Sequence, residues 1–361
     1  MANPNEQVAE QSPKASKVII AVNTYDGVGY FVDSEGRFLF RKQFEKVSKF
    51  SEGLAPVKQN GKWGFINTQG EVVASCNFDD TGNFHEGLAR VKQNGKWGFI
   101  NTKGEVIVPC IYDDANWFSE GLACVKQNDK WGYINTKGEV VVPCIYDDAN
   151  WFSEGLARVQ KNGKYGFINT KGEVVIPCIY DDAFGFNEGL APVEQNYKWG
   201  FINTKGEVVL PYIYDMTWGF YNGLAAVEKN CKWGFINPKG EVIVPCIYDY
   251  AGIFYEDLAV VEKKVKWGFI NTKGEVVIPC IYDDASPFSE GIAHVKQNDK
   301  YGFINTEGKV VIPCIYGEAG NFSEGLAKVE QNGKYSIIYK EGKVIVAECG
   351  ENTSWSKVEM E

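Results

Sequence analysis

The feature that most constrains the fold of this chain is a repeat with a constant length of 34 residues. An aromatic residue followed by a small residue returns at this spacing nine times, without an insertion. The pairs are Trp63-Gly64, Trp97-Gly98, Trp131-Gly132, Tyr165-Gly166, Trp199-Gly200, Trp233-Gly234, Trp267-Gly268, Tyr301-Gly302 and Tyr335-Ser336. A degraded copy, residues 29–32, lies one period before the first pair, which gives about ten units. A fixed period of this length predicts a repeat protein whose units bury their apolar faces against one another.

The unbroken period predicts one array over residues 18–349 instead of two or three domains. A polar tail, residues 1–17, is expected before the array and a C-terminal tail, residues 350–361, after it. The first residues contain no apolar core of signal-peptide length, and the nearest apolar run is far shorter than the ~20 residues of a membrane span. We therefore expect no membrane span and a cytoplasmic location, with export by a non-classical route, or removal of a signal peptide from this sequence, as the open alternatives.

Composition favours β structure and argues against nucleic acid as a partner. Aromatic residues make up 14% of the chain and glycines number 39, which suits large packed rings joined by frequent turns. The formal net charge is −10, and no basic patch compensates it. Binding to nucleic acid depends largely on cationic neutralisation of phosphates, so no nucleic-acid partner is expected.

Each unit is predicted to be a three-stranded antiparallel meander. In residues 88–93 the positions of Ala89 and Val91 keep their residue types from unit to unit, whereas the position of Arg90 varies freely. This alternation predicts a strand with one buried face and Arg90 on the outward face. Asn94-Gly95 favours a two-residue hairpin turn, and two further strands are expected before Pro109.

We expect these units to stack into an open superhelix or solenoid, with a closed β-propeller-like array as the alternative. Propellers usually have about four to eight blades of four strands, so ten units of three strands favour the open form. The degraded first unit and the altered last unit are typical of the caps of an open array.

The repeated Gly-Lys-Trp-Gly-Phe-Ile-Asn-Thr-Lys-Gly-Glu-Val, with a downstream Phe-Ser-Glu-Gly-Leu-Ala, resembles the WG (or KWG) repeat of bacterial proteins. The resemblance covers roughly residues 18–349. It implies a β-rich repeat array and a bacterial origin, and it names no activity. The departures from the repeat are tyrosine at positions 165, 301 and 335 and Ser336 in place of glycine, which fit ring exchange and a terminal cap.

The loop that connects two units carries the candidate binding residues. The position of Phe118 is phenylalanine from Phe50 to Phe322, which indicates packing, while the two positions before it vary. We predict that partner choice depends on the large aromatic residues at these variable positions, which are Trp117, Trp151, Phe184 and Trp218. The Trp of each Trp-Gly pair is instead expected to pack within the array.

A column of charged residues changes sign along the array. Its members are Lys58, Lys92, Lys126, Gln160, Glu194, Glu228, Glu262, Lys296 and Glu330. We predict that Glu194, Glu228 and Glu262 orient a partner that has a complementary charge pattern.

No metal, cofactor or catalytic group is predicted. The Pro-Cys series, of which Cys110 is one member, is expected to consist of buried free thiols, with Cys124 and Cys231 exposed to solvent. The Asp113-Asp114 pair and its equivalents raise the possibility of Ca²⁺ binding, but the pair decays in later units and is better explained by a turn. The two histidines, His85 and His294, occupy unrelated positions.

Together these observations predict a non-catalytic scaffold for protein–protein interaction, with an unidentified protein as partner. The alternative is a cell-wall or glycan-binding module, because other aromatic-glycine hairpin repeats bind sugars.

Overall fold

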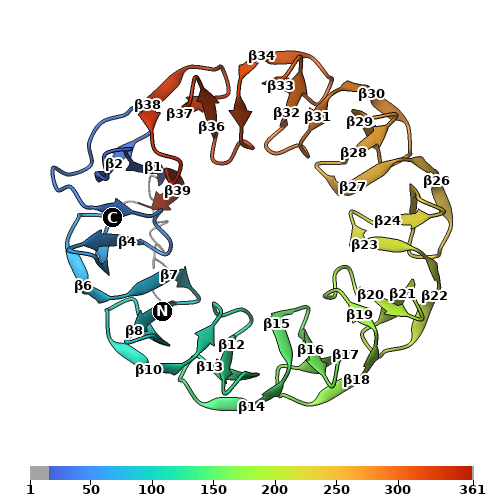
Figure 1. Cartoon of the computed structure of the whole chain (residues 1–361), viewed down its shortest axis with the longest axis horizontal. Helices are drawn as coiled ribbons and strands as arrows, with labels where there is room; N and C mark the ends of the chain where they lie inside the picture. The colour runs from blue at the N-terminus through green and yellow to red at the C-terminus, as the bar shows by residue number, and fades with distance from the viewer. Residues whose placement is uncertain (1–15, 360–361) are drawn as a thin grey trace, which may run out of the picture.

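The computed structural model describes residues 16–359, and these residues form 39 strands and no helix. The strands make ten small sheets arranged around a ring with a wide central opening (Figure 1). The described residues thus include no helix that is long and apolar enough to cross a membrane. The fold is all-β, a ten-bladed β-propeller arrangement of tandem repeats.

Nine of the ten blades have four strands, which are consecutive in the chain and antiparallel. The innermost strands, which lie nearest the central opening, are β3 (Lys46–Val47), β7 (Asp80–His85), β11 (Asp114–Ala115), β15 (Asp148–Ser153), β19 (Asp182–Ala183), β23 (Met216–Tyr221), β27 (Tyr250–Tyr255), β31 (Asp284–Ala285) and β35 (Glu318–Ala319). The second strands are β4 (Leu54–Gln59), β8 (Leu88–Gln93), β12 (Leu122–Gln127), β16 (Leu156–Lys161), β20 (Leu190–Gln195), β24 (Leu224–Lys229), β28 (Leu258–Lys263), β32 (Ile292–Gln297) and β36 (Leu326–Gln331).

The third strands, which carry the Trp-Gly pairs, are β5 (Lys62–Asn67), β9 (Lys96–Asn101), β13 (Lys130–Asn135), β17 (Lys164–Asn169), β21 (Lys198–Asn203), β25 (Lys232–Ile236), β29 (Lys266–Asn271), β33 (Lys300–Asn305) and β37 (Lys334–Tyr339). The outermost strands are β6 (Val72–Phe78), β10 (Val106–Tyr112), β14 (Val140–Tyr146), β18 (Val174–Tyr180), β22 (Val208–Tyr214), β26 (Val242–Tyr248), β30 (Val276–Tyr282), β34 (Val310–Tyr316) and β38 (Val344–Cys349). The three strands predicted for each unit are therefore present. The connecting loop adds a fourth, the innermost strand.

The tenth blade joins the two ends of the chain. It consists of β2 (Gly29–Asp33), β1 (Ser16–Asn23) and β39 (Ser354–Glu359), with β39 antiparallel to β1. The prediction of an open solenoid is wrong, and the alternative of a closed propeller-like array is confirmed. The physical reason is that the degraded first unit lacks its own innermost strand, and the C-terminal strand supplies one.

This closure also corrects the predicted boundaries. Residues 354–359 of the expected C-terminal tail form β39. The expected N-terminal tail lies outside the described residues except for Ser16 and Lys17, which belong to β1.

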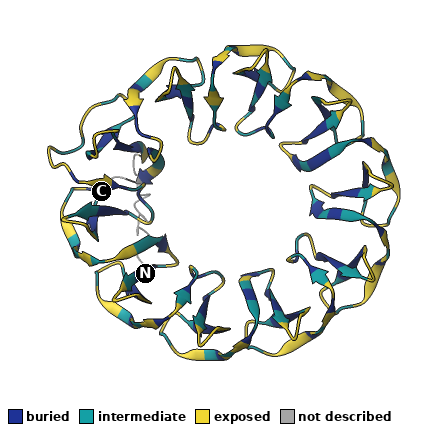
Figure 2. Cartoon of the chain, in the orientation of Figure 1, coloured by how far each residue is buried: buried dark blue, intermediate teal, exposed yellow. Residues whose placement is uncertain are grey.

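Each blade is buried on both faces, because it is sandwiched between two neighbours (Figure 2). In β9, Phe99 packs with Phe118 of the following blade, while Ile100 packs with Phe84 and Phe65 on the other side. The position of Arg90, expected to face outward, therefore lies between blades. Its equivalents Cys124, Ala226 and Val260 are buried.

The Trp-Gly pair is explained by a bulge in the outermost strand. A Cβ added to Gly98 would lie 2.4 Å from the carbonyl oxygen of Val108 and 2.7 Å from the amide nitrogen of Cys110. The strand register of β10 against β9 shifts at this point, so that its backbone crosses over the glycine. The aromatic ring before the glycine is buried or half-buried in every unit, as the packing interpretation predicts.

Candidate binding surface

The repeated carboxylates hold neighbouring blades together. Asp113 forms an ion pair with Lys96, and its other oxygen accepts a hydrogen bond from the amide of Asn128 in the next hairpin at 3.0 Å. The hydrogen bond from Lys96 lowers the pKa of Asp113 below its ordinary value. On the opposite rim of the ring, Glu86 accepts a hydrogen bond from the amide of Gly121 in the next blade at 2.8 Å. These acidic groups are engaged in structure, and no group of three possible metal ligands occurs within residues 16–359.

The cysteines are free thiols, but their burial differs in part from the prediction. The Pro-Cys series is half-buried, and burial raises the pKa of the Cys110 thiol, which contacts the carbonyl of Val91 at 3.6 Å. Cys231 is exposed as expected. Cys124, expected to be exposed, is buried, and burial raises its pKa to about 11. The expectation for Cys124 failed because its strand faces a neighbouring blade on both sides.

The four predicted aromatic residues divide into two kinds. Trp117 and Trp151 are 40% and 47% exposed, and they stack on each other across two blades with ring centroids 5.5 Å apart. Phe184 and Trp218 occupy the preceding loop position and are half-buried. Phe184 stacks on Trp199 at 5.0 Å, and Trp218 stacks on Trp233 at 5.8 Å. Trp117 and Trp151 are therefore exposed, whereas Phe184 and Trp218 each pack on a tryptophan of a Trp-Gly pair.

A cavity of about 490 Å³ brings three of the four rings together. Trp151, Phe184 and Trp218 line it, along with Arg158 and Tyr221. It therefore joins three consecutive blades at their inner edges. The indole Nε1 of Trp218 is buried, and within the described part of the chain it has no hydrogen-bond partner.

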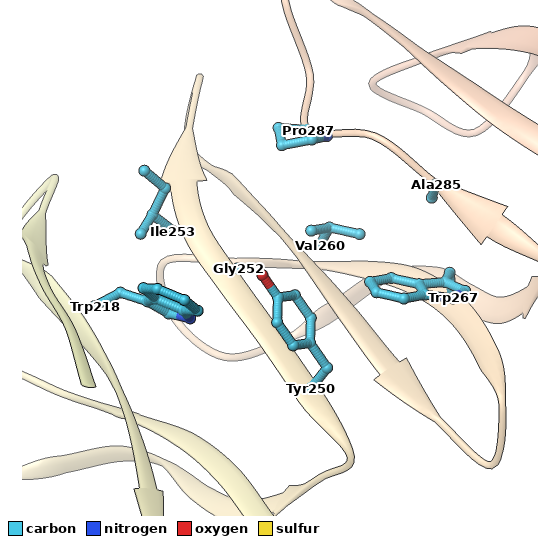
Figure 3. A pocket seen from close by; sticks show the side chains of 8 residues that line it. All are labelled: Trp218, Tyr250, Gly252, Ile253, Val260, Trp267, Ala285 and Pro287. Atoms are coloured by element: carbon cyan, nitrogen blue, oxygen red, sulfur yellow. The ribbon is translucent and has the colours of Figure 1, made fainter. Parts of the chain in front are cut away.

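A second cavity, of about 350 Å³, continues from Trp218 to the next two blades. Figure 3 shows Trp218, Tyr250 and Trp267 side by side along it. We call the set Trp117, Trp151, Phe184, Trp218 and Tyr250 the inner aromatic arc. The sequence analysis missed Tyr250, which replaces the second Asp of the repeated pair, and that loss of a common polar residue was the available signal.

The charged column lies beside the repeated rings and is not a free surface stripe. Three of the four lysines in the column, Lys58, Lys92 and Lys296, place their ammonium over the aromatic ring, as for Lys92 over Trp97 at 5.4 Å and Lys296 over Tyr301 at 5.7 Å. Glu194, Glu228 and Glu262 occupy the same position and are half-buried. Burial raises the pKa of Glu194, and Asp182 and Asp181 add to this shift. The predicted orienting role of these three glutamates remains a prediction.

Comparison with known proteins identifies the repeat. A family model described as a WG containing repeat matches residues 31–63, 63–97, 97–131, 131–165, 165–199, 199–233, 233–266, 267–301 and 301–335. This match confirms the resemblance drawn from the sequence. No curated protein matches the chain.

Solved structures resemble this chain at low sequence identity. The crystal structure of the eukaryotic initiation factor has a TM-score of 0.54 and 12% identity, covering 94% of this chain and 98% of that chain. BamB from Moraxella catarrhalis has a TM-score of 0.38 and 11% identity, covering 86% and 90% of the two chains. The first likeness supports the fold alone.

Proposed function

The chain belongs to the WG-repeat family, and on this premise we propose that it is a non-catalytic scaffold that binds a polypeptide along the inner aromatic arc. The observation that carries the proposal is the continuity of this surface: the exposed Trp117–Trp151 stack leads into the two cavities, which meet at Trp218. Exposed tryptophan and tyrosine beside arginine are enriched at the centres of protein interfaces.

An extended polypeptide suits the shape and polarity of the arc. The two cavities follow one another across several blades, so a ligand that fills both must be long. Trp218 lines both cavities, so a ligand that spans them contacts this side chain. Arg158 adds a cationic group at the edge of the larger cavity.

The chemistry of the repeated groups supports a non-catalytic role. The aspartates are paired with lysines, the loop glutamates accept backbone hydrogen bonds, and the buried thiols have raised pKa values that disfavour the nucleophilic thiolate. The free cysteines favour a reducing compartment, which supports a cytoplasmic location as part of the proposal.

The test compares the Trp117→Ala, Trp151→Ala double variant with the wild-type chain. Because both rings are substantially exposed, we expect the melting temperature to fall by only a few degrees. Polypeptides captured from a lysate of the source organism by the wild-type chain are purified and titrated calorimetrically. We expect the dissociation constant to rise at least tenfold in the double variant, since central aromatic anchors contribute about 2 kcal/mol or more each.

Tyr197→Ala is the matched control, because Tyr197 is 89% exposed on a hairpin turn and belongs to no part of the arc. Equal affinity of the double variant and this control would contradict the proposed surface. A glycan array probed in parallel tests the alternative: saturable sugar binding that is lost in the double variant, without any polypeptide ligand, would replace the proposal by glycan binding.

A further inference from the structure

The repeated aromatic rings are covered by the chain's own side chains in most blades. Arg90 places its guanidinium 4.7 Å from the centre of the Trp97 ring, and its Nη1 donates a hydrogen bond to the carbonyl of Ala115 in the next blade at 2.6 Å. Arg158 repeats the arrangement, 4.8 Å from the Tyr165 ring and 2.8 Å from the carbonyl of Ala183. These two blades define a guanidinium site formed by a ring and a carbonyl of the neighbouring blade.

The β27–β30 blade has the same site without a guanidinium. Trp267 stands at the repeat position of Trp97, and Ala285 stands at that of Ala115. The position of Arg90 is occupied by Val260, which is too short to reach over the ring. The 350 Å³ cavity lies at this place, and Trp267, Ala285 and Val260 all line it (Figure 3).

A glycine explains why the space stays open. In the β7–β10 blade a Cβ added to Gly82 would lie 3.0 Å from the side chain of Arg90, so this glycine makes room for the arginine. The β27–β30 blade has glycine at the same position, Gly252, next to Val260. In other blades that position carries a large ring, such as Trp218, which itself covers a repeated tryptophan. The β27–β30 blade thus has neither an arginine at position 260 nor a large ring at position 252. Tyr250 lies beside Trp267, with ring centroids 5.4 Å apart, and forms one wall of the open cavity.

Two carboxylates, those of Glu262 and Asp284, stand near the cavity without lining it, and that of Asp284 also accepts a hydrogen bond from the Tyr301 hydroxyl at 2.8 Å. Glu262 stands directly opposite Tyr250 on one side and Trp267 on the other in the strand register. Asp284 occupies the repeat position of Asp182, whose carboxylate lies 4.0 Å from Nη1 of Arg158. A guanidinium over an aromatic face gains cation–π attraction, and nearby carboxylates strengthen its binding.

We propose that the cavity beside Trp267 binds the side chain of an arginine supplied by a polypeptide partner. The guanidinium lies over the Trp267 ring and donates to the carbonyl of Ala285, as Arg90 and Arg158 do within the chain. The polypeptide nature of the ligand rests on the proposed function, whereas the guanidinium site is testable by itself.

The probe is Nα-acetyl-arginine N-methylamide, and its citrulline counterpart is the uncharged control. Binding is followed by the indole ¹H–¹⁵N signals, with Trp267 assigned from a Trp267→Phe variant. We expect the arginine probe to shift the Trp267 signal saturably in the wild-type chain and the citrulline probe to shift it at least tenfold more weakly. In Val260→Arg the chain supplies its own guanidinium, and we expect the response to the probe to disappear. No response in the wild-type chain, or an unchanged response in Val260→Arg, overturns the proposal.

The double variant Arg90→Val, Lys92→Glu is the reciprocal variant and decides the matter if Val260→Arg does not fold. It places the equivalents of Val260 and Glu262 beside Trp97 and removes the lysine ammonium from that ring, so we expect a second saturable response, at the Trp97 indole. Absence of this response overturns the proposal. This test is separable from the test of the proposed function. If the probe binds at Trp267 but the Trp117→Ala, Trp151→Ala variant keeps its affinity for the partner, the proposed scaffold surface is wrong and the guanidinium site is retained.

Discussion

The closing blade and the nine repeated blades have similar shapes but are joined to their neighbours in different ways. Between repeated blades the same contacts recur, such as the Lys96–Asp113 ion pair and the hydrogen bond from Gly121 to Glu86. The closing blade uses contacts that occur once. The amide group of Asn23 donates to the carbonyl of Val47 at 2.9 Å, and its oxygen accepts from the amide of Val47, also at 2.9 Å.

The same asparagine reaches the other end of the chain. Its side chain donates to the carbonyl of Asn352 at 3.0 Å, and its backbone N–H donates to the hydroxyl of Thr353 at 3.1 Å. In the next blade the repeat position of Asn23 is Val57, which is buried in an apolar cluster. A buried polar residue where the repeat has an apolar one therefore marks the joint of the ring. Such a group is stable only while its partners are in place.

The largest expected effect comes from removing the joint. Deleting residues 354–361 takes away β39, exposes the hydrogen-bonding edge of β1 and removes the buried Val358. We expect the free energy of unfolding to fall by on the order of 5 kcal/mol, from several lost hydrogen bonds and the exposed apolar area. Small-angle scattering should show a larger radius of gyration as the ring opens.

Deleting only residues 360 and 361 is the matched control for that truncation. If both truncations leave the melting temperature and the radius of gyration unchanged, β39 does not hold the ring closed, and the contrast between the two kinds of blade disappears.

The last repeated blade differs from the others at Ser336, which stands at the repeat position of Gly98. Trp131 pairs with Tyr146, whereas Tyr335 pairs with Cys349, one residue earlier in the repeat, so the outermost strand β38 is shorter. We expect Gly98→Ser to destabilise the protein by about 3 kcal/mol or more, because its Cβ would meet backbone of β10. Ser336→Gly should change stability by less than about 1 kcal/mol. Chemical denaturation of both variants checks this, and equal effects would show that the bulge is not the reason for the glycine.

A substitution in one hairpin turn is expected to change the free energy of unfolding by a smaller amount and to stabilise the protein. Lys264 and Val265 both adopt positive φ, 54° and 56°, in the turn where four other blades use Asn-Gly. A β-branched residue is strained in this conformation by about 1–2 kcal/mol. We therefore expect Val265→Gly to raise the free energy of unfolding by about 1 kcal/mol, measured by denaturant titration. Gly95→Val should lower it by a similar amount, and a neutral result for both would mean that the turns do not contribute to stability.

Much of the structure of a blade was predictable because the same sequence pattern is repeated in each unit. The hairpin at Asn94-Gly95 has positive φ at both residues, as the dipeptide predicts, and the three longer strands follow the predicted pattern. The fourth strand was missed because in several blades it is only two residues long, as in β11, and too short to show alternation. Closure was missed because β39 occurs once in the chain, and a single-copy strand leaves no periodic signal.

The candidate site was also predicted only in part. Variable loop positions identified Trp117, Trp151, Phe184 and Trp218, and three of these line one cavity. The cavity beside Trp267 was missed because the position of Arg90 was interpreted as outward-facing. Its small and apolar equivalents, Cys124, Ala226 and Val260, were the available sign that this face is covered by another blade.

The smallest predicted effect concerns the ion pairs that distinguish repeated blades from the closing one. The hydrogen bond from Lys96 lowers the pKa of Asp113 in the folded state. A carboxylate with a lowered folded pKa contributes stability above its unfolded pKa of about 3.9, and this contribution is lost as the pH falls through the folded pKa. We therefore expect Asp113→Asn to melt at a slightly lower temperature than the wild-type chain at pH 7. The difference should shrink towards zero as the pH falls through the folded pKa, because Asp113 then becomes protonated in both states. Since these groups are exposed, added salt should also reduce the difference at pH 7. A difference that stays constant as the pH falls through the folded pKa would show that Asp113 acts through its shape alone, with its charge playing no part between the blades.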